Sequence, residues 1–303
     1  MNVNHIILAL FPLIALIALG YLFKKYNFLS EGFWSGAEKL NYYVLFPTLL
    51  FHSLSKAQIN LQHLNHTIFV MCLVVIAITI GLYIIRIFRH IPSARFGVHV
   101  QSLVRFNTYI GLALVTTLFG HTGQAILAIL LAFCIPLVNI ISVFALTPKD
   151  QMAIRPVLFA LFKNPLILAC LLGGVFNTLE IPLWIGFDGL IKLLSASSLP
   201  LGLLCVGAAL QFIQIKQDIV IVIINTLARL LIVPAISYGL SLYFGLSTLA
   251  MQVLVIFMAL PTAPTSYILT KALGGDSQLM AAVISFQTLC AVLTLPIVIW
   301  WMH

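Results

Sequence analysis

Residues 12–23 read PLIALIALGYLF, and residues 165–176, which lie 153 positions further along the chain, read PLILACLLGGVF. Both stretches begin with Pro-Leu-Ile, contain Leu-Gly at the same place and have Phe at position twelve. Such matches can arise by chance in a leucine-rich chain. A single match of this kind would therefore not establish a repeat.

The same offset of 153 residues relates further parts of the sequence. It carries the Pro-x-x-Leu of 47–50 onto that of 200–203, and the segment 107–111 onto the segment 260–264. Several matches at one fixed offset favour a duplicated chain over coincidence. Membrane proteins built from two similar halves are common among secondary transporters.

The composition is that of a membrane protein. Of the 303 residues, 62% are hydrophobic and only 7% are charged, whereas a soluble domain has roughly a quarter charged residues. The apolar runs are long enough to cross a bilayer core of about 30 Å as helices, and the short alternating segments of a β-barrel are absent. We therefore predict an all-α polytopic membrane protein.

Ten membrane spans, five in each half, are predicted from the apolar runs and the charged or Gly/Pro residues between them. They lie near residues 4–23, 35–55, 66–88, 96–119, 123–146, 157–178, 190–211, 219–243, 248–271 and 278–301. The predicted domains are a first repeat (1–146), a polar hinge loop (147–156) and a second repeat (157–303). No Lys or Arg precedes the first apolar run, so we expect a retained helix there rather than a cleaved signal peptide.

Five spans in each half would make the second repeat enter the membrane from the opposite face, which is an inverted repeat. The loop charges orient this topology. Eleven basic residues fall on one side: Lys24, Lys25, Lys39, Arg86, Arg89, Arg95, Lys149, Arg155, Lys163, Lys216 and Lys271. Only Lys56 and Lys192 fall on the other. By the positive-inside rule the basic side is cytoplasmic, so both termini are expected outside an inner (plasma) membrane.

The net charge of +8 and the five cysteines have simple explanations in this setting. Because the basic residues lie in short loops and act as topology signals, they do not indicate a nucleic-acid partner. The cysteines lie in apolar runs without CxxC spacing, where cysteine is usually a small buried hydrophobic residue. We infer no disulfide framework, no metal site and no cofactor.

Spans four and nine are the predicted places of interruption. Span nine contains Pro261, Thr262, Pro264 and Thr265, and two prolines three residues apart remove backbone donors and disturb the preceding turn. Span four contains the polar, glycine-bearing segment 105–111 at the equivalent place. A kinked but fully packed helix is the alternative for each. Two interruptions at symmetry-related positions favour a substrate site near the bilayer midplane.

Arg105 and Arg229 lie about ten residues inside their predicted spans. A charge at such a depth is costly, so it usually faces the protein interior and has a partner. No acidic residue lies deep in a predicted span, because the seven are in loops or at span ends: Glu31, Glu38, Asp150, Glu180, Asp188, Asp218 and Asp276. An anionic substrate would supply the missing counter-charge. Snorkelling to the interface, or binding of helix carbonyls, is the alternative for both arginines.

The sequence assigns no coupling ion. Proton and sodium carriers commonly keep carboxylates inside the membrane. In their place this chain offers His52, near the outer end of span two, and the amides Asn41, Asn139, Asn225 and Gln287. We expect His52 to be an interface residue rather than a proton relay.

Several motifs resemble the auxin efflux carrier family. Segment 40–47, LNYYVLFP, is similar to the signature of that family in its second helix. The remaining matches extend the resemblance over nearly the whole chain: RFNTYIG at 105–111, NPLI at 164–167, LPLGLL at 199–204 with Gly207, LPTAP at 260–264 and GGD at 274–276.

The resemblance implies ten helices in two inverted repeats. Helices one, two, six and seven would form a scaffold, and helices four and nine would cross at their breaks, with Asn107 as a substrate contact. The chain lacks the helix-four proline and the long cytoplasmic loop of plant members. The resemblance is therefore to compact bacterial malonate or malate permeases rather than to plant auxin exporters.

The predicted function is secondary transport of a small organic anion, such as a mono- or dicarboxylate, by alternating access. The candidate substrate-binding residues are Arg105, Asn107, Thr108, Gly111, Arg229, Pro261, Thr262, Pro264 and Thr265. The lipid bilayer is the expected surrounding, and a homodimer is a possible assembly. The alternative is a receptor that uses the same fold without transport. An intramembrane enzyme is less well supported, because the sequence contains no HExxH or GxSxG motif and no paired buried carboxylates.

Overall fold

The computed structural model describes residues 3–57, 64–147, 163–211 and 218–302. Within these ranges every regular element is helical and no strand occurs. Six helical segments are long and apolar enough to cross a membrane, and two shorter apolar helices accompany them. The predicted all-helical membrane fold is confirmed. Most of the predicted hinge 147–156, and the start of the predicted sixth span, lie outside the described residues.

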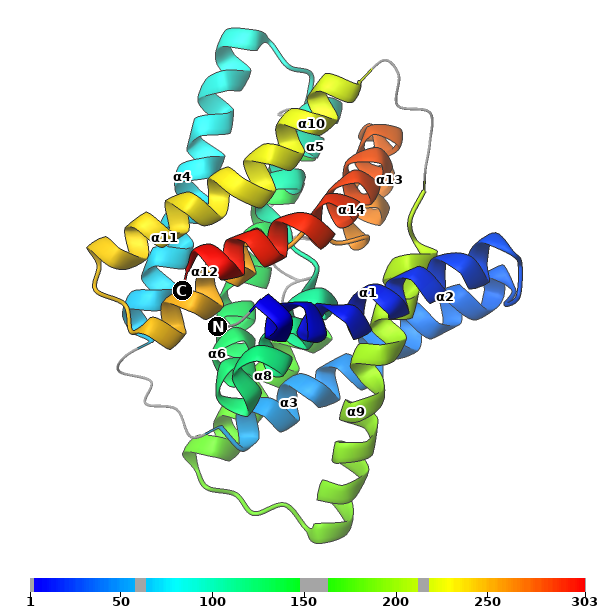
Figure 1. Cartoon of the computed structure of the whole chain (residues 1–303), viewed down its shortest axis with the longest axis vertical. Coiled ribbons are helices and arrows are strands. Elements are labelled where there is room, and N and C mark those ends of the chain that lie inside the picture. Colours follow the sequence, from blue (N-terminus) through cyan, green and yellow to red (C-terminus); the bar gives the residue numbers. More distant parts are fainter. Residues whose placement is uncertain (1–2, 58–63, 148–162, 212–217, 303) are drawn as a thin grey trace.

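The first half forms a series of helices in which two predicted spans are subdivided (Figure 1). Its elements are α1 (Val3–Lys25), α2 (Glu31–Leu40), η1 (Asn41–Leu45), α3 (Phe46–Ser55), α4 (Asn65–Arg89), α5 (Ser93–Val104) and α6 (Thr108–Leu146). Helices α2 and α3 are joined without a gap by the π-helical turn η1. Helix α6 turns sharply at Gly120, whose φ of 60° glycine adopts without a steric penalty.

The second half is also helical where the structure describes it. Its elements are α8 (Pro165–Thr178), α9 (Ile185–Ala208), α10 (Ile219–Leu227), η4 (Ala228–Ile232), α11 (Val233–Tyr243), α12 (Thr248–Ala259), α13 (Thr265–Ala272) and α14 (Ser277–Trp301). The start of α8 shows why such sequences begin helices. Asn164 accepts a hydrogen bond from the Leu166 N–H at 2.9 Å, and Pro165 occupies the first helical position, where no N–H is needed.

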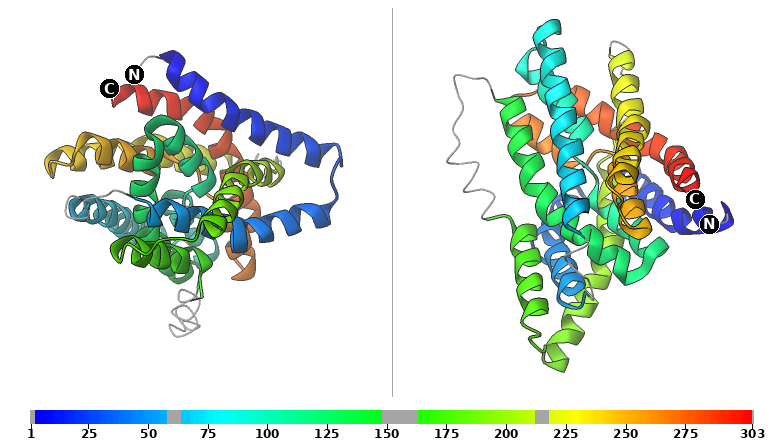
Figure 2. Two further views of the ribbon diagram at one scale, coloured as in Figure 1. Left: turned by 90° about the horizontal axis from the view of Figure 1, so that it is seen from below. Right: turned by 90° about the vertical axis from the view of Figure 1, so that its left-hand side faces the viewer.

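The helices form two packed groups (Figure 1). Helix α1 packs on α9, and α3 packs on α8 and α9. The second group contains α4, α5, α6 and α10 to α14, with α6 also reaching the first group. The start of α1 and the end of α14 lie side by side (Figure 2).

Glycines permit close backbone contacts within the first group. A Cβ atom on Gly20 of α1 would lie 2.0 Å from the carbonyl oxygen of Leu204 in α9. A Cβ atom on Gly173 of α8 would lie 2.9 Å from the carbonyl oxygen of Phe51 in α3. Gly173 lies 153 residues after Gly20, and Phe51 lies 153 residues before Leu204. The repeat seen in the sequence therefore recurs as a repeated contact.

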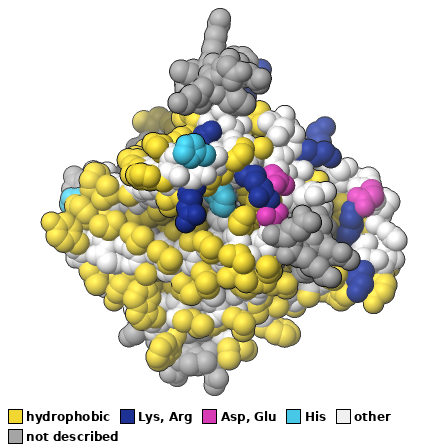
Figure 3. Space-filling model, turned by 90° about the horizontal axis from the view of Figure 1, so that it is seen from above, with side chains coloured by type: hydrophobic (Ala, Val, Ile, Leu, Met, Phe, Trp, Pro, Cys, Tyr) yellow, Lys and Arg dark blue, Asp and Glu magenta, His cyan; other side chains and the backbone are white. Residues whose placement is uncertain are grey.

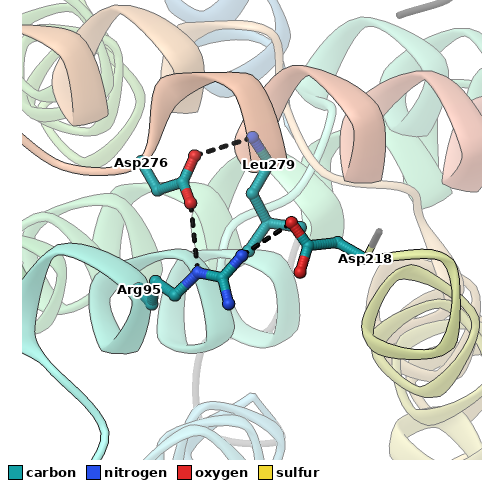
Figure 4. Close-up of polar contacts among 4 residues, drawn as sticks. All are labelled: Arg95, Asp218, Asp276 and Leu279. Atoms are coloured by element: carbon teal, nitrogen blue, oxygen red, sulfur yellow. Dashed lines mark hydrogen bonds and ion pairs between the residues drawn. The ribbon is translucent and has the colours of Figure 1, made fainter. Parts of the chain in front are cut away.

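One end of the molecule gathers charged side chains beside exposed apolar surface (Figure 3). There Arg95, in the first turn of α5, binds Asp218 at 2.6 Å and Asp276 at 3.2 Å (Figure 4). Asp276 also accepts a hydrogen bond from the Leu279 N–H at 3.0 Å, which caps α14. This arginine clamp, formed by Arg95, Asp218 and Asp276, holds together the starts of α5, α10 and α14.

Candidate functional site

Two interruptions of the helices meet inside the second group. Residues 105–107 separate α5 from α6, and residues 260–264 separate α12 from α13. The backbone N–H of Asn107 donates to the carbonyl of Pro261 at 2.8 Å. The first break thus supplies the donor and the second the acceptor, which satisfies two backbone groups left free by the interruptions. Gly111, in the first turn of α6, leaves room for the second break, because a Cβ there would lie 2.5 Å from Leu260 Cδ1.

A cavity of about 530 Å³ lies against the two breaks. Its lining runs from exposed residues, Ser35, Lys39 and Ala272, to buried ones such as Asn107 and Val206. Much of the wall is apolar or aromatic, with Tyr42, Tyr43, Phe46, Phe106, Tyr109, Ile135, Val138 and Leu166. The cavity therefore joins an accessible mouth to the place where the helices are interrupted.

Asn107 presents an unpaired donor at the cavity wall. Its side-chain oxygen accepts hydrogen bonds from the backbone N–H groups of Tyr109 at 3.2 Å and Ile110 at 3.3 Å, capping α6. The cap fixes the orientation of the amide, and its Nδ2 has no hydrogen-bond partner among the described residues. Because Asn107 is only 1% exposed, water does not readily satisfy this group. The Nδ2 is a buried donor whose hydrogen-bonding capacity is unused in this structure.

Arg105 lines the same cavity with its charge uncompensated. Its guanidinium donates to Asn139 Oδ1 at 3.1 Å and Thr265 Oγ1 at 3.2 Å, and both partners are neutral. No carboxylate pairs with it in the described chain. Thr108 and Thr265 begin α6 and α13, so the positive ends of two helix dipoles also lie at the cavity. This combination of groups favours an anion.

Arg229 has a different environment from Arg105. It is 1% exposed, lies in η4 and does not line the cavity. Its Nε donates to the carbonyl of Leu260 at 2.8 Å, and its Nη1 donates to that of Leu103 at 2.7 Å. These carbonyls lie at the C-terminal ends of α12 and α5, where helix dipoles are negative. These contacts agree with the alternative interpretation from the sequence, in which the arginine binds helix carbonyls.

Thr262 also lies away from the cavity, in a buried polar network. Its hydroxyl contacts Gln287 Oε1 at 2.7 Å and the Ser102 carbonyl at 3.0 Å, and its N–H donates to the same Gln287 oxygen at 2.9 Å. Gln287 Nε2 donates to the Ser102 carbonyl at 3.2 Å. The network ties α14 and α5 to the second break.

The structure thus divides the predicted site residues into two sets. Those at the cavity are Arg105, Asn107, Thr108, Pro264 and Thr265. Those outside its lining are Gly111, Arg229, Pro261 and Thr262. Sequence reasoning missed Glu38, Tyr42, Tyr109 and Asn164 as lining residues. For Asn164 the helix-start pattern Asn-Pro was an available signal, whereas nothing in the sequence shows which way Glu38 faces.

Comparison with known proteins identifies the class of protein to which this site belongs. A family model described as "Membrane transport protein" matches residues 5–156 and 148–299. The chain belongs to this membrane transport family. The match confirms the resemblance to auxin efflux carriers drawn from the motifs.

A relative agrees with this assignment. The chain is 24% identical over 293 residues to a protein described as an uncharacterized transporter from Methanothermobacter thermautotrophicus, and the match covers 94% of each chain. Membership of the membrane transport family, together with several apolar helices, makes this a multi-pass membrane protein.

Proposed function

We propose that this protein is a secondary carrier of a small organic anion, such as a mono- or dicarboxylate. The observation that carries the proposal is a pair of groups on two cavity-lining residues at the first break. The Arg105 guanidinium has only neutral partners, and the Asn107 Nδ2 has no partner in the described chain. A carboxylate between them would accept charge-assisted hydrogen bonds from both.

The cavity suits a small ligand with an apolar part. Its volume of about 530 Å³ is within the range of small-molecule sites. Tyr42, Phe46 and Tyr109 offer aromatic surface, while Thr108 and Thr265 offer hydroxyl groups. In this proposal Gly111, Pro261 and Pro264 shape the breaks, and Thr262 and Arg229 hold them in place behind the cavity.

Transport would proceed by alternating access at the crossing of the two broken segments. In this proposal the fold is ten helices in two inverted repeats, residues 1–146 and 157–303, joined by the loop 147–156. The glycine contacts Gly20–Leu204 and Gly173–Phe51 support it, since the same offset relates them. The group of α1, α3, α8 and α9 would be the scaffold against which the other helices move.

We place the protein in the inner (plasma) membrane with both termini outside. The excess of Lys and Arg in the loops on the opposite side supports this orientation. The proximity of the start of α1 to the end of α14 is consistent with termini on a single face.

Flux measurements test the proposed function. Purified protein would first be screened by thermal shift with mono- and dicarboxylates, because a ligand of the folded state raises its apparent stability. Uptake of the labelled hits would then be measured in proteoliposomes. We expect saturable uptake that is lost in the double variant Arg105→Ala, Asn107→Ala. Unchanged uptake in the double variant would contradict the site, and binding without flux would favour a receptor.

A further inference from the structure

The cavity that holds Arg105 also holds a carboxylate. Glu38, near the end of α2, lines it and is partly buried. The predicted topology had placed Glu38 with the loop and span-end acids. The structure places it on the wall of the candidate anion site.

Glu38 differs from the other described carboxylates in being partly buried and having no salt bridge. Glu31 pairs with Lys24 and Asp188 with Lys56, while Asp218 and Asp276 share Arg95. Glu180 is exposed to solvent. In the part of the chain that the structure describes, Glu38 is therefore the one partly buried carboxylate without an ion pair.

The other titratable and charged groups that line the cavity with Glu38 come from several elements. They are Lys39 on its own helix, Tyr42 and Tyr43 on η1, Arg105 at the first break, Tyr109 on α6 and Cys205 on α9. Lys39 is exposed at the mouth, and Arg105 is held by Asn139 and Thr265. None of these groups forms a salt bridge with Glu38.

A carboxylate here interacts unfavourably with an anionic ligand in the same cavity. Solvent screens Lys39, which is exposed at the mouth, so the charges inside the empty cavity are the positive Arg105 and the negative Glu38. Adding an anion leaves an excess of negative charge beside apolar walls, unless Glu38 becomes neutral. If its carboxylate takes a proton from water, the loaded cavity again has one positive and one negative group. Anion and proton then favour each other's binding by the same factor.

We propose that Glu38 is the proton-binding residue of this carrier, taking up one proton when the anion binds near Arg105. The inference rests on the proposed function. Proton and anion cross together, and on release the Glu38 O–H bond breaks and the proton returns to water on the other side. The ligand class is a monovalent carboxylate accompanied by a proton, so the transported unit carries no net charge.

Calorimetry on the wild-type chain tests the proton directly. Binding of the monocarboxylates acetate, propionate and benzoate would be titrated in two buffers of different ionisation enthalpy, between about pH 6 and pH 8, where these acids are mostly ionised. We expect uptake of up to about one proton per anion, with Kd falling up to tenfold for each unit of pH decrease. Binding without proton uptake overturns the proposal and leaves the proposed function standing. If none of the three acids binds, the result contradicts both this proposal and the proposed function for this ligand class.

Glu38→Gln mimics the protonated residue, so this variant tests whether the proton binds at Glu38. The variant should bind the anion at every pH as tightly as the wild type does at low pH, without proton uptake. In vesicles containing a pH-sensitive dye, it should import anion without the internal acidification seen with wild type. The matched control is Glu31→Gln on the same helix, where the carboxylate is exposed and paired with Lys24; it should keep the wild-type pH dependence.

Two results with Glu38→Gln would overturn the assignment. Unchanged pH dependence would place the proton elsewhere. Loss of anion binding at every pH in a folded variant would make Glu38 a structural or direct binding group. Should Glu38→Gln fail to fold, Glu38→Asp replaces it, and the proposal then requires proton uptake to persist with a displaced pH midpoint.

Discussion

At the scale of single residues, Arg105 and Arg229, both within predicted spans, show how much depends on what a side chain faces. Arg105 binds neutral oxygens at the cavity, and Arg229 binds the carbonyls of Leu103 and Leu260 behind it. The first has charge available for a ligand, whereas the second compensates helix ends. We therefore expect substitutions at these positions to have different consequences.

Arg229→Leu should destabilise the protein strongly. It leaves two buried carbonyls without their donors, each at a cost of about 1–3 kcal/mol. We expect a clear drop in the thermal unfolding midpoint in detergent, partly restored in Arg229→Lys. A midpoint equal to that of the wild type would contradict the helix-end role.

Arg105→Leu is the matched counterpart. Arg105 is less buried than Arg229 and has neutral partners, so its removal should change the unfolding midpoint much less. Carboxylate binding should nevertheless be lost, because the only cation at the buried end of the described cavity is gone. Calorimetric titration measures this, and retained affinity would exclude Arg105 from the site.

Substitutions of Asn107 separate its two roles. Asn107→Asp keeps an oxygen to cap α6 but replaces the free donor with a negative charge, whereas Asn107→Ala also removes the cap, at about 1 kcal/mol. We expect Asn107→Asp to unfold near the wild-type midpoint and to bind carboxylate at least about tenfold more weakly, since hydrogen bonds to charged groups contribute about 1.5–3 kcal/mol. Tight binding by Asn107→Asp would show that the amide does not contact the anion.

At the scale of helices, glycine sets the distance between α1 and α9. A Cβ on Gly20 would lie 2.0 Å from the Leu204 carbonyl oxygen, and one on Gly207 would lie 1.9 Å from that of Ile17. Since the obstacle is backbone, rotation of a side chain cannot relieve it. The two helices would have to move apart.

Gly20→Ala should accordingly destabilise the protein by about 1–3 kcal/mol or more, as overpacking does. The control is Gly81→Ala in α4, where nothing lies within 4 Å of the added Cβ. There the exchange should stabilise the helix by up to about 1 kcal/mol. Thermal midpoints of the two variants should move in opposite directions, and parallel shifts would contradict the packing argument.

The positions of the helix interruptions were the features most readily predicted from the sequence. The directions in which side chains point were the least readily predicted. Pro261 and Pro264 mark the second break in sequence, and the Asn107-Thr108 pair marks the start of α6. The orientations of Glu38 and Arg229 depend on how α2 and η4 rotate against other helices. Both elements are short, with ten residues in α2 and five in η4, so periodicity alone does not identify the inward face.

At the scale of the whole molecule, the orientation in the membrane can be tested by labelling. In a background without the native cysteines, Lys25→Cys and Lys192→Cys place thiols on exposed positions at opposite predicted sides. In intact cells we expect a membrane-impermeant maleimide to label Lys192→Cys and to spare Lys25→Cys until the membrane is opened. The reverse pattern would invert the topology.

The hydrogen bond between Asn107 N–H and the Pro261 carbonyl also has a consequence for biosynthesis. The donor leaves the ribosome long before its acceptor. An N–H without a partner is poorly tolerated in hydrocarbon, so the first break cannot reach its final form while only the first half is inserted. A nascent chain stopped at residue 156 would carry Arg105 and Asn107 but would lack the second break of the proposed site. The proposed site would therefore form late in synthesis, when the second break arrives.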